Sequence, residues 1–167
     1  QNIWGWSGIL IEPVKARYQK LLKFRGNKNI CIHSACTEND KIKKIKLVNL
    51  GRMSFIDVQK NRTSINKEKH THVAQELMIG KGYKEIVPNN TLTNILMKKK
   101  IYTLDLAVID VEGTEQLLLE GLNLKKIKIN YICIETYNFK KINTLLKKNK
   151  YYLIDKLSNH DYLYKKK

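Results

Sequence analysis

The amino-acid sequence predicts an α/β fold, in which a mostly parallel sheet is flanked by helices and closed by an antiparallel hairpin at the carboxyl terminus. Two observations lead to this prediction. Short aliphatic runs, typical of strands buried on both faces, alternate with segments in which apolar residues recur at helical spacing. The last two strand-like runs are separated only by Ser158, Asn159 and His160, which is typical of a hairpin. With 167 residues the chain has room for one core, so we assign residues 1–167 to a single domain.

The first elements illustrate how each boundary is predicted. Pro13 ends the first aliphatic run because proline cannot donate to a strand ladder, and it is suited to begin a helix. Gly26 and Asn27 then end that helix. Strand, helix and strand in succession form a βαβ unit, whose crossover is almost always right-handed. We expect strands at residues 7–13, 29–36, 41–50, 85–88, 104–110, 130–135, 151–157 and 161–164.

The expected helices occupy the intervening segments. Asn89 and Asn90 are predicted to cap the third of them, and residues 51–66 are predicted to form a loop. The helices are expected at residues 14–25, 67–79, 91–99, 114–122 and 139–148.

The formal net charge of +17 favours polyanionic partners such as nucleic acid, anionic membrane or anionic glycan. However, 32 residues are basic and only Arg17, Arg25, Arg52 and Arg62 are arginines. Arginine forks read bases and clamp phosphates, so their scarcity argues against specific nucleic-acid recognition. We interpret the charge as a basic, solvated surface and expect no specific nucleic-acid partner, with a basic polyanion-binding protein as the alternative.

The cysteines and the apolar runs indicate a cytoplasmic protein without a membrane span. Cys31, Cys36 and Cys133 are odd in number and lack metal-ligand spacing, so we expect them to be reduced and partly buried. No apolar run approaches the ~18 residues that a membrane-spanning helix requires. The sequence begins at Gln1 without a methionine and enters a strand almost at once, which favours a fragment or a trimmed chain.

Carboxylates follow three of the predicted strands. In open α/β sheets ligands bind at the carboxyl ends of the strands, so Glu12, Asp110 and Glu135 are candidate site residues. Glu12 is placed to accept both hydroxyl hydrogens of a ribose diol, or alternatively to stabilise the start of the next helix. Asp110, with Glu112 in the turn after it, is placed to orient or deprotonate an acceptor hydroxyl, or alternatively to cap backbone amides. Glu135 should neighbour Asp110 and is the candidate substrate-binding residue.

Other site chemistry is less well supported by the sequence. The strand-end acids could hold a divalent cation, but their spacing does not demand one and we expect no metal site. The histidines are His33, inside a strand, and His70, His72 and His160; none is expected to be catalytic.

Several segments, in order along nearly the whole chain, resemble the FkbM family of S-adenosylmethionine-dependent methyltransferases. The most specific of them is Ile-Asp-Val-Glu-Gly-Thr-Glu at residues 109–115, because the family carries an Ile-Asp-Val-Glu-Gly-x-Glu run after its fourth strand. The segments are residues 6–13, 34–35, 50–54, 87–96, 106–115 and 160–163.

The resemblance implies a Rossmann-like class I methyltransferase sheet with S-adenosylmethionine as cofactor. It implies that Glu12 binds the cofactor ribose, that Ala35, Cys36 and Thr37 lie beside the adenine, and that Asp110 contacts the cofactor near the reacting methyl group. The family acts mainly on hydroxyl oxygens, so the expected acceptor is a sugar, another glycan or a small metabolite. Methyl displacement from a sulfonium requires the acceptor oxygen to be held in line and its proton to be removed, and it requires no metal.

One departure from the family concerns the first strand and its glycine-rich loop, which are expected before residue 1 and are absent from the sequence. In the family this strand lies between the strands that end at Glu12 and Asp110. Its absence would leave two strand edges unpaired. We therefore expect this chain alone to bind cofactor poorly, and an inactive methyltransferase remnant is a further alternative.

Overall fold

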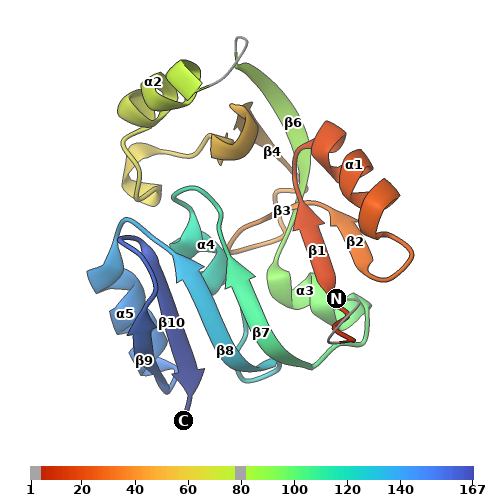
Figure 1. The fold of residues 1–167 in the computed structure, drawn as a ribbon, viewed down its shortest axis with the longest axis vertical. Helices are drawn as coiled ribbons and strands as arrows, with labels where there is room; N and C mark the ends of the chain where they lie inside the picture. The colour runs from red at the N-terminus through yellow and green to blue at the C-terminus, as the bar shows by residue number, and fades with distance from the viewer. Residues whose placement is uncertain (1–4, 78–81) are drawn as a thin grey trace.

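The computed structural model describes residues 5–77 and 82–167 (Figure 1). Its helices are α1 (Lys15–Arg25), α2 (Lys67–Leu77), α3 (Leu92–Lys98), α4 (Glu115–Glu120) and α5 (Phe139–Lys148), with 3₁₀ turns η1 (Gly51–Met53) and η2 (Lys60–Arg62). Its strands are β1 (Ile9–Glu12), β2 (Ile30–His33), β3 (Ala35–Cys36), β4 (Lys44–Asn49), β5 (Phe55–Ile56), β6 (Tyr83–Asn90), β7 (Thr103–Ile109), β8 (Lys128–Glu135), β9 (Tyr151–Lys156) and β10 (Asp161–Lys166).

The described strands form three sheets. One contains β1 and β2, another has the order β7-β8-β10-β9, and the third has the order β3-β6-β4-β5. Parallel pairs join β1 to β2, β7 to β8 and β3 to β6, whereas the pairs made by β4 and by β10 are antiparallel. The α/β class is confirmed. The mostly parallel arrangement is not confirmed, because antiparallel pairs are as prominent as parallel ones.

In the described part of the chain, one edge of β1 and one edge of β7 lack a strand partner. Among the described residues β1 pairs only with β2, and β7 pairs only with β8. Figure 1 shows the arrowheads of β1 and β7 on the same side of the molecule, with the two strands facing each other across the middle of the fold. The carboxyl ends of both strands therefore lie at one face, where the candidate acids follow them.

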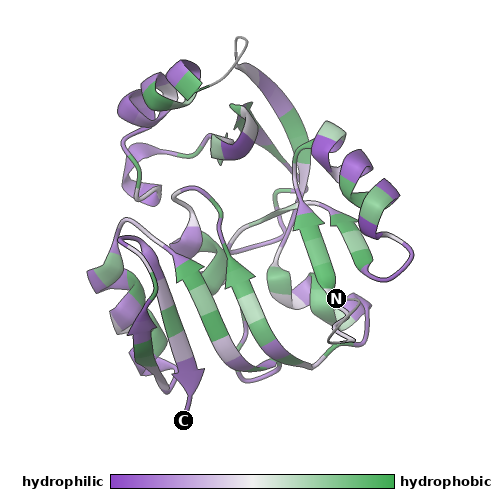
Figure 2. Ribbon diagram, in the orientation of Figure 1, coloured by the Kyte–Doolittle hydropathy of each residue, from purple (hydrophilic) through white to green (hydrophobic). Residues whose placement is uncertain are grey.

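The main core lies under β7 and β8. Ile129, Ile132 and Ile134 of β8 are fully buried, and α5 packs Ile142 and Leu146 against the same cluster. Aliphatic residues dominate the central strands, as the green segments of Figure 2 show. Tyr151 at the start of β9 is also buried, and its hydroxyl donates a 2.7 Å hydrogen bond to the Ile129 carbonyl oxygen. The carboxyl-terminal hairpin is thereby fixed to the central strands.

The predicted strand at residues 29–36 is wrong as a single element. It breaks at Ser34, so that β2 pairs with β1 while β3 pairs with β6 in another sheet. Ser34 is buried and its hydroxyl bonds the neighbouring Ala35 carbonyl oxygen at 2.7 Å. The chain thus leaves one sheet and joins another without a polar turn that the sequence would reveal.

The predicted cap of the third helix is also corrected. Asn89 and Asn90 lie in β6, which is longer than the expected strand at residues 85–88. Thr91 is the cap instead, because its side chain accepts a 3.1 Å hydrogen bond from the Asn94 amide. The Asn89 side-chain amide instead ties β6 to residues 39–42, because it donates hydrogen bonds to the Asn39 and Ile42 carbonyl oxygens at 3.2 and 2.8 Å.

The central region is more ordered than expected. The loop predicted at residues 51–66 contains η1, β5 and η2, and β5 pairs with β4. The predicted helix at 67–79 is present as α2 up to Leu77, and its last two expected residues, Met78 and Ile79, lie outside the described residues. No helix in the described ranges is long and apolar enough to cross a membrane.

Candidate functional site

Three acids lie at the carboxyl ends of strands, and two of these strands, β7 and β8, pair with each other. Glu12 ends β1 and Glu135 ends β8, while Asp110 directly follows β7. Asp110 neighbours Glu135 across the parallel pair, since the register aligns Ile109 with Ile134. This end of the sheets is where ligands bind in α/β proteins.

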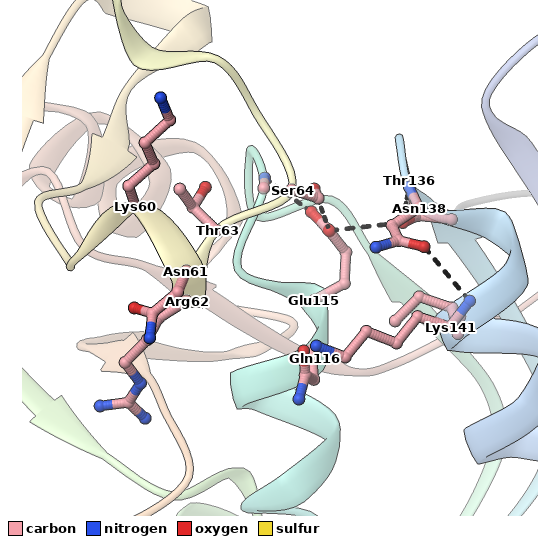
Figure 3. Close-up of a pocket in the computed structure, with 12 residues that line it drawn as sticks. Lys60, Asn61, Arg62, Thr63, Ser64, Glu115, Gln116, Thr136, Asn138 and Lys141 are labelled. Atoms are coloured by element: carbon pink, nitrogen blue, oxygen red, sulfur yellow. Dashed lines mark hydrogen bonds between the residues drawn. The ribbon is translucent and has the colours of Figure 1, made fainter.

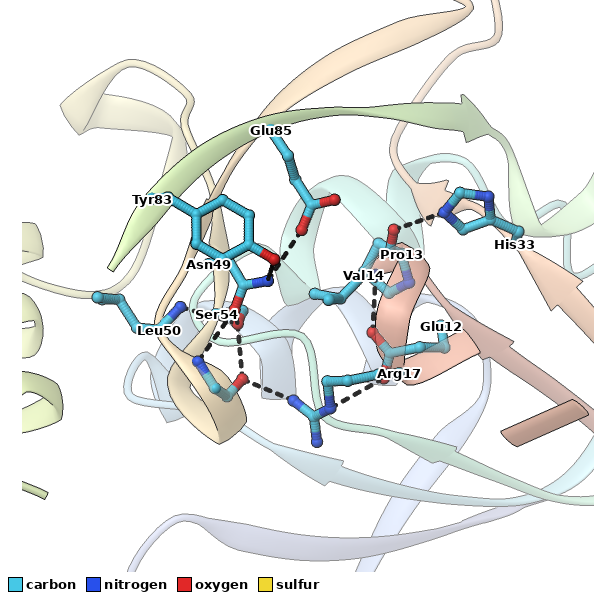
Figure 4. Close-up of polar contacts among 11 residues, drawn as sticks. Glu12, Pro13, Val14, Arg17, His33, Asn49, Leu50, Ser54, Tyr83 and Glu85 are labelled. Carbon is cyan, nitrogen blue, oxygen red and sulfur yellow. Dashed lines mark hydrogen bonds and ion pairs between the residues drawn. The ribbon is translucent and has the colours of Figure 1, made fainter. Parts of the chain in front are cut away.

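Glu12 is held by contacts within the chain (Figure 4). One of its carboxylate oxygens accepts a 2.8 Å hydrogen bond from the Val14 amide, and the other lies 3.6 Å from Arg17 Nε. Arg17 also donates a 2.6 Å hydrogen bond to the Gly51 carbonyl oxygen. Glu12 therefore supports the start of α1, as the second predicted alternative states. Its side chain is 21% exposed, and ribose binding stays a prediction.

Asp110 faces solvent at the strand end. Desolvation by surrounding protein atoms raises the pKa of its carboxyl, the nearby charge of Asp161 raises it further, and Arg17 lowers it. Arg17 on α1 is therefore within electrostatic range of Asp110, although β1, which precedes α1, and β7 belong to different sheets. We refer to the region at these strand ends, around Glu12, Asp110 and Glu135, as the strand-end opening.

Glu112 occupies a strained turn after β7. Its φ of 49° is in the left-handed region, which a residue other than glycine adopts at a cost of roughly 1–2 kcal/mol. Burial raises the pKa of its carboxyl to about 7, and the charges of Asp110, Glu135 and Glu115 contribute in that order. A carboxyl with a pKa near neutrality can accept or donate a proton at physiological pH.

Glu135 and Tyr137 complete the acidic opening. Desolvation and the charges of Asp110 and Asp161 raise the pKa of Glu135, while His160 lowers it. Desolvation, followed by Glu135, Glu112 and the other acids, raises the pKa of the Tyr137 hydroxyl. Repelling carboxylates at one place, on a chain of net charge +17, make this opening locally acidic. Such an opening attracts a cationic ligand.

Glu115 is a functional candidate that the sequence analysis missed. It is 2% exposed, and its carboxylate accepts hydrogen bonds from the Gly113 amide at 2.7 Å, from Ser64 Oγ at 3.1 Å and from Thr136 Oγ1 at 3.5 Å. Figure 3 shows Ser64 and Thr136 converging on it from different segments. Its place as the last acid of Ile-Asp-Val-Glu-Gly-Thr-Glu is the one signal that could have identified it.

Beside Glu115 lies a cavity of about 110 Å³. Its lining includes Ser64, Gly113, Asn138 and Lys141, but not Asp110, Glu112 or Glu135. The cavity therefore lies next to the strand-end opening without being part of it.

Replacing Glu115 with alanine is expected to lower the free energy of unfolding by about 2–3 kcal/mol, because the buried Gly113 amide and Ser64 hydroxyl lose their acceptor. Glu115→Gln keeps one carbonyl acceptor and is expected to cost about 1 kcal/mol or less. Urea unfolding of both variants measures the difference, with Glu120→Ala on the exposed end of α4 as the control. Equal losses in the alanine and glutamine variants would contradict this role.

Ala35, Cys36 and Thr37 are buried in the structure. Thr37 donates a 3.0 Å hydrogen bond to Asn89 Oδ1, and its backbone packs against Gly121, where an added Cβ would lie 2.1 Å from the Thr37 carbonyl oxygen. Burial raises the pKa of Cys36 to about 12, so its thiol stays protonated. These residues lie at the junction of β3, β6 and α4. Their proposed contact with adenine remains a prediction.

One further residue, His70, reaches the turn after β7 from a segment between strands. His70 is buried on α2, with its Nε2 atom 2.9 Å from the Met53 carbonyl oxygen and 3.6 Å from Glu112 Oε2. The sequence analysis did not expect a functional histidine, and only the packing of α2 against the turn reveals this one. Within residues 5–77 and 82–167, no three His, Cys, Asp or Glu side chains are placed to hold a metal ion together.

The fold is of the α/β class, in which ligands bind at the carboxyl ends of parallel strands, where these carboxylates lie. The family model described as "Methyltransferase FkbM domain" matches residues 2–164, which is nearly the whole chain. The chain therefore belongs to the FkbM methyltransferase family, and its general function is methyl transfer. Comparisons with curated proteins and with solved structures found no significant match.

Proposed function

We propose that the protein transfers a methyl group from S-adenosylmethionine to a hydroxyl oxygen of a sugar or another small metabolite. The observation that carries this proposal is the convergence of Glu12, Asp110 and Glu135 at the carboxyl ends of β1, β7 and β8 in a chain of this family. Glu12 binds the ribose hydroxyls, and Asp110 lies between the cofactor and the acceptor.

The charge of the opening fits this cofactor. The cofactor supplies a methyl group on a positively charged sulfonium. Desolvation by burial, followed by repulsion from nearby carboxylates, raises the pKa of Asp110, Glu112 and Glu135. A cation among these carboxylates relieves that repulsion. The same repulsion makes the opening unsuited to a polyanion, although the net charge of +17 favours polyanion binding elsewhere on the surface.

The acids have separate tasks in this proposal. Asp110 accepts a hydrogen bond from the acceptor hydroxyl and orients its oxygen, and Asp110 or the neighbouring Glu112 takes the proton. Glu112 is suited to this because its pKa of about 7 lets it hold and release a proton near neutral pH. Glu135 binds a second polar group of the acceptor, which is a small molecule or a glycan.

The open edges of β1 and β7 support a further part of the proposal. Among the described residues neither edge has a strand partner, and one additional parallel strand between them would pair with both. That strand would complete a Rossmann-like sheet and bring its own following loop to the site between Glu12 and Asp110. Ala35, Cys36 and Thr37 would then lie near the adenine. The free cysteines Cys31, Cys36 and Cys133 are consistent with a cytoplasmic location.

Calorimetric titration of S-adenosylhomocysteine into the full-length protein tests the proposal. Wild-type protein is expected to bind, and Glu12→Gln is expected to weaken binding by about tenfold to a hundredfold, because a charged acceptor for the ribose diol is lost. Glu76→Gln is the control, since Glu76 is an exposed acid on α2 with no proposed contact to the cofactor. If neither wild type nor control binds S-adenosylhomocysteine, and the protein binds a polyanion with salt-sensitive affinity, the proposed methyltransferase function is wrong. The polyanion-binding alternative is then favoured.

A further inference from the structure

His70 connects a segment remote in sequence to the turn after β7. It is 7% exposed on α2, and its ring packs edge-on against Phe55 with 5.5 Å between the ring centroids. The Met53 carbonyl oxygen lies 2.9 Å from Nε2 and can only accept a hydrogen bond, so Nε2 carries the hydrogen. The same Nε2 lies 3.6 Å from Glu112 Oε2. The imidazole therefore directs an N–H group toward the space shared by Met53 and Glu112.

This contact is one of several between the two segments. The Ser64 amide donates to the Gly113 carbonyl oxygen at 2.8 Å, and the Ser64 hydroxyl donates to Glu115 at 3.1 Å. Gly113 has a φ of 96°, and a Cβ at this position would lie 2.9 Å from Ile65 side-chain carbons. Residues 63–70 therefore pack closely over the turn at residues 112–115, and His70 is the member of this segment that meets the Glu112 side chain.

We propose that His70 is a positioning residue for Glu112, holding its carboxyl beside the end of β7 through an Nε2–H group anchored on the Met53 carbonyl oxygen. The expected effect of His70 on the rate of methyl transfer rests on the proposed function, whereas its contact with Glu112 does not. Glu112 needs such a restraint because its left-handed backbone is strained and its carboxyl faces other acids that repel it.

The charged groups around Glu112 come from every element packed near it. Asp110 follows β7, Glu135 ends β8 and Glu115 begins α4, and all three raise the pKa of Glu112. Arg17 on α1 lowers the pKa of Glu112. Tyr137 also lies nearby, because the charge of Glu112 contributes to the raised pKa of the Tyr137 hydroxyl. His70 on α2 places the positive end of its Nε2–H dipole 3.6 Å from Glu112 Oε2, which is a favourable electrostatic contact and not a hydrogen bond.

The test compares His70→Phe, which keeps an aromatic ring beside Phe55 but has no donor, with His70→Gln, which keeps an N–H donor of similar reach. His72→Phe is the matched control, because His72 lies on the same helix with its side chain 74% exposed. The first measurement is a pH titration of the Glu112 carboxyl carbon by NMR, assigned by its absence in Glu112→Gln. It requires neither cofactor nor acceptor.

In His70→Phe the Glu112 midpoint is expected to rise by about half a pH unit, because the N–H dipole beside the carboxylate is lost. His70→Gln and His72→Phe are expected to stay near the wild-type midpoint. In full-length enzyme His70→Phe should lower kcat roughly tenfold to a hundredfold with little change in cofactor KM, and His70→Gln should restore most of the rate. An unchanged midpoint in folded His70→Phe overturns the proposal. A shifted midpoint in a protein that does not transfer methyl groups leaves the contact standing and counts against the proposed function instead.

Discussion

Replacing Asp110 with asparagine is expected to lower kcat for methyl transfer by about 10²–10⁴-fold, the range that a positioned general base contributes. Asparagine has the same shape and can still hydrogen-bond an acceptor hydroxyl, but it cannot accept the proton. Cofactor binding should change little in comparison, because Glu12 supplies the main polar contact to the ribose in our proposal. Steady-state kinetics with labelled methyl donor, together with calorimetric titration of S-adenosylhomocysteine, separate the two effects.

Asp105→Asn is the control for this experiment. Asp105 is an exposed acid on the same strand, where it accepts a 3.3 Å hydrogen bond from Asn130. It lies inside β7 and away from the strand end, so its loss should leave kcat near the wild-type value. Activity of Asp110→Asn within about threefold of wild type would exclude Asp110 as the base, because that factor is far below the contribution of general base catalysis.

Replacing Glu112 with glutamine is expected to remove a pH dependence of stability. The folded-state pKa of Glu112 is raised from 4.5 to about 7, so between these values the folded protein binds a proton that the unfolded chain has released. The stability that this proton contributes is fully present below pH 4.5 and is lost as the pH rises through about 7. Wild type should therefore lose stability across this window through Glu112, and glutamine should not.

Urea unfolding at about pH 5 and about pH 8 measures the effect. At the higher pH Glu112→Gln is expected to be more stable than wild type by about 1–3 kcal/mol, and the difference should be much smaller at the lower pH. Glu76→Gln provides the control, since Glu76 is an exposed acid on α2. An identical pH dependence in wild type and Glu112→Gln would show that the Glu112 carboxyl is not held in the environment described here.

The elements that depend on local pattern were predictable. The predicted helix at residues 139–148 coincides with α5, where Ile142 and Leu146 recur on one face and are buried. The strands around Ala107 and Ile132 were expected from their continuous aliphatic runs. Burial on both faces, which such runs indicate, is incomplete in β7, because Val108 is 71% exposed. The strand-end positions of Glu12, Asp110 and Glu135 followed from the same runs, because each acid ends one of them.

The elements that depend on distant partners were not predictable. β3 leaves the strand before it at Ser34 because β6, more than 50 residues away in sequence, offers it a partner at Asn89 and Asn90. Likewise, the contact of Ser64 with Glu115 and that of His70 with Glu112 form only when residues 63–70 pack over the turn after β7. Their residue types alone carry no signal of these contacts, since a buried acid and a buried histidine are defined by what packs around them.

The most direct test of the account is to locate S-adenosylmethionine on the full-length protein by NMR, from the backbone amide shifts that it perturbs. We predict that the strongest perturbations fall at the carboxyl ends of β1 and β7, at Glu12 to Val14 and at Asp110 to Gly113, with weaker ones near Thr37 and Glu135. Perturbations confined to other surfaces, or none at saturating cofactor, would contradict the assignment of this opening as the methyl-transfer site.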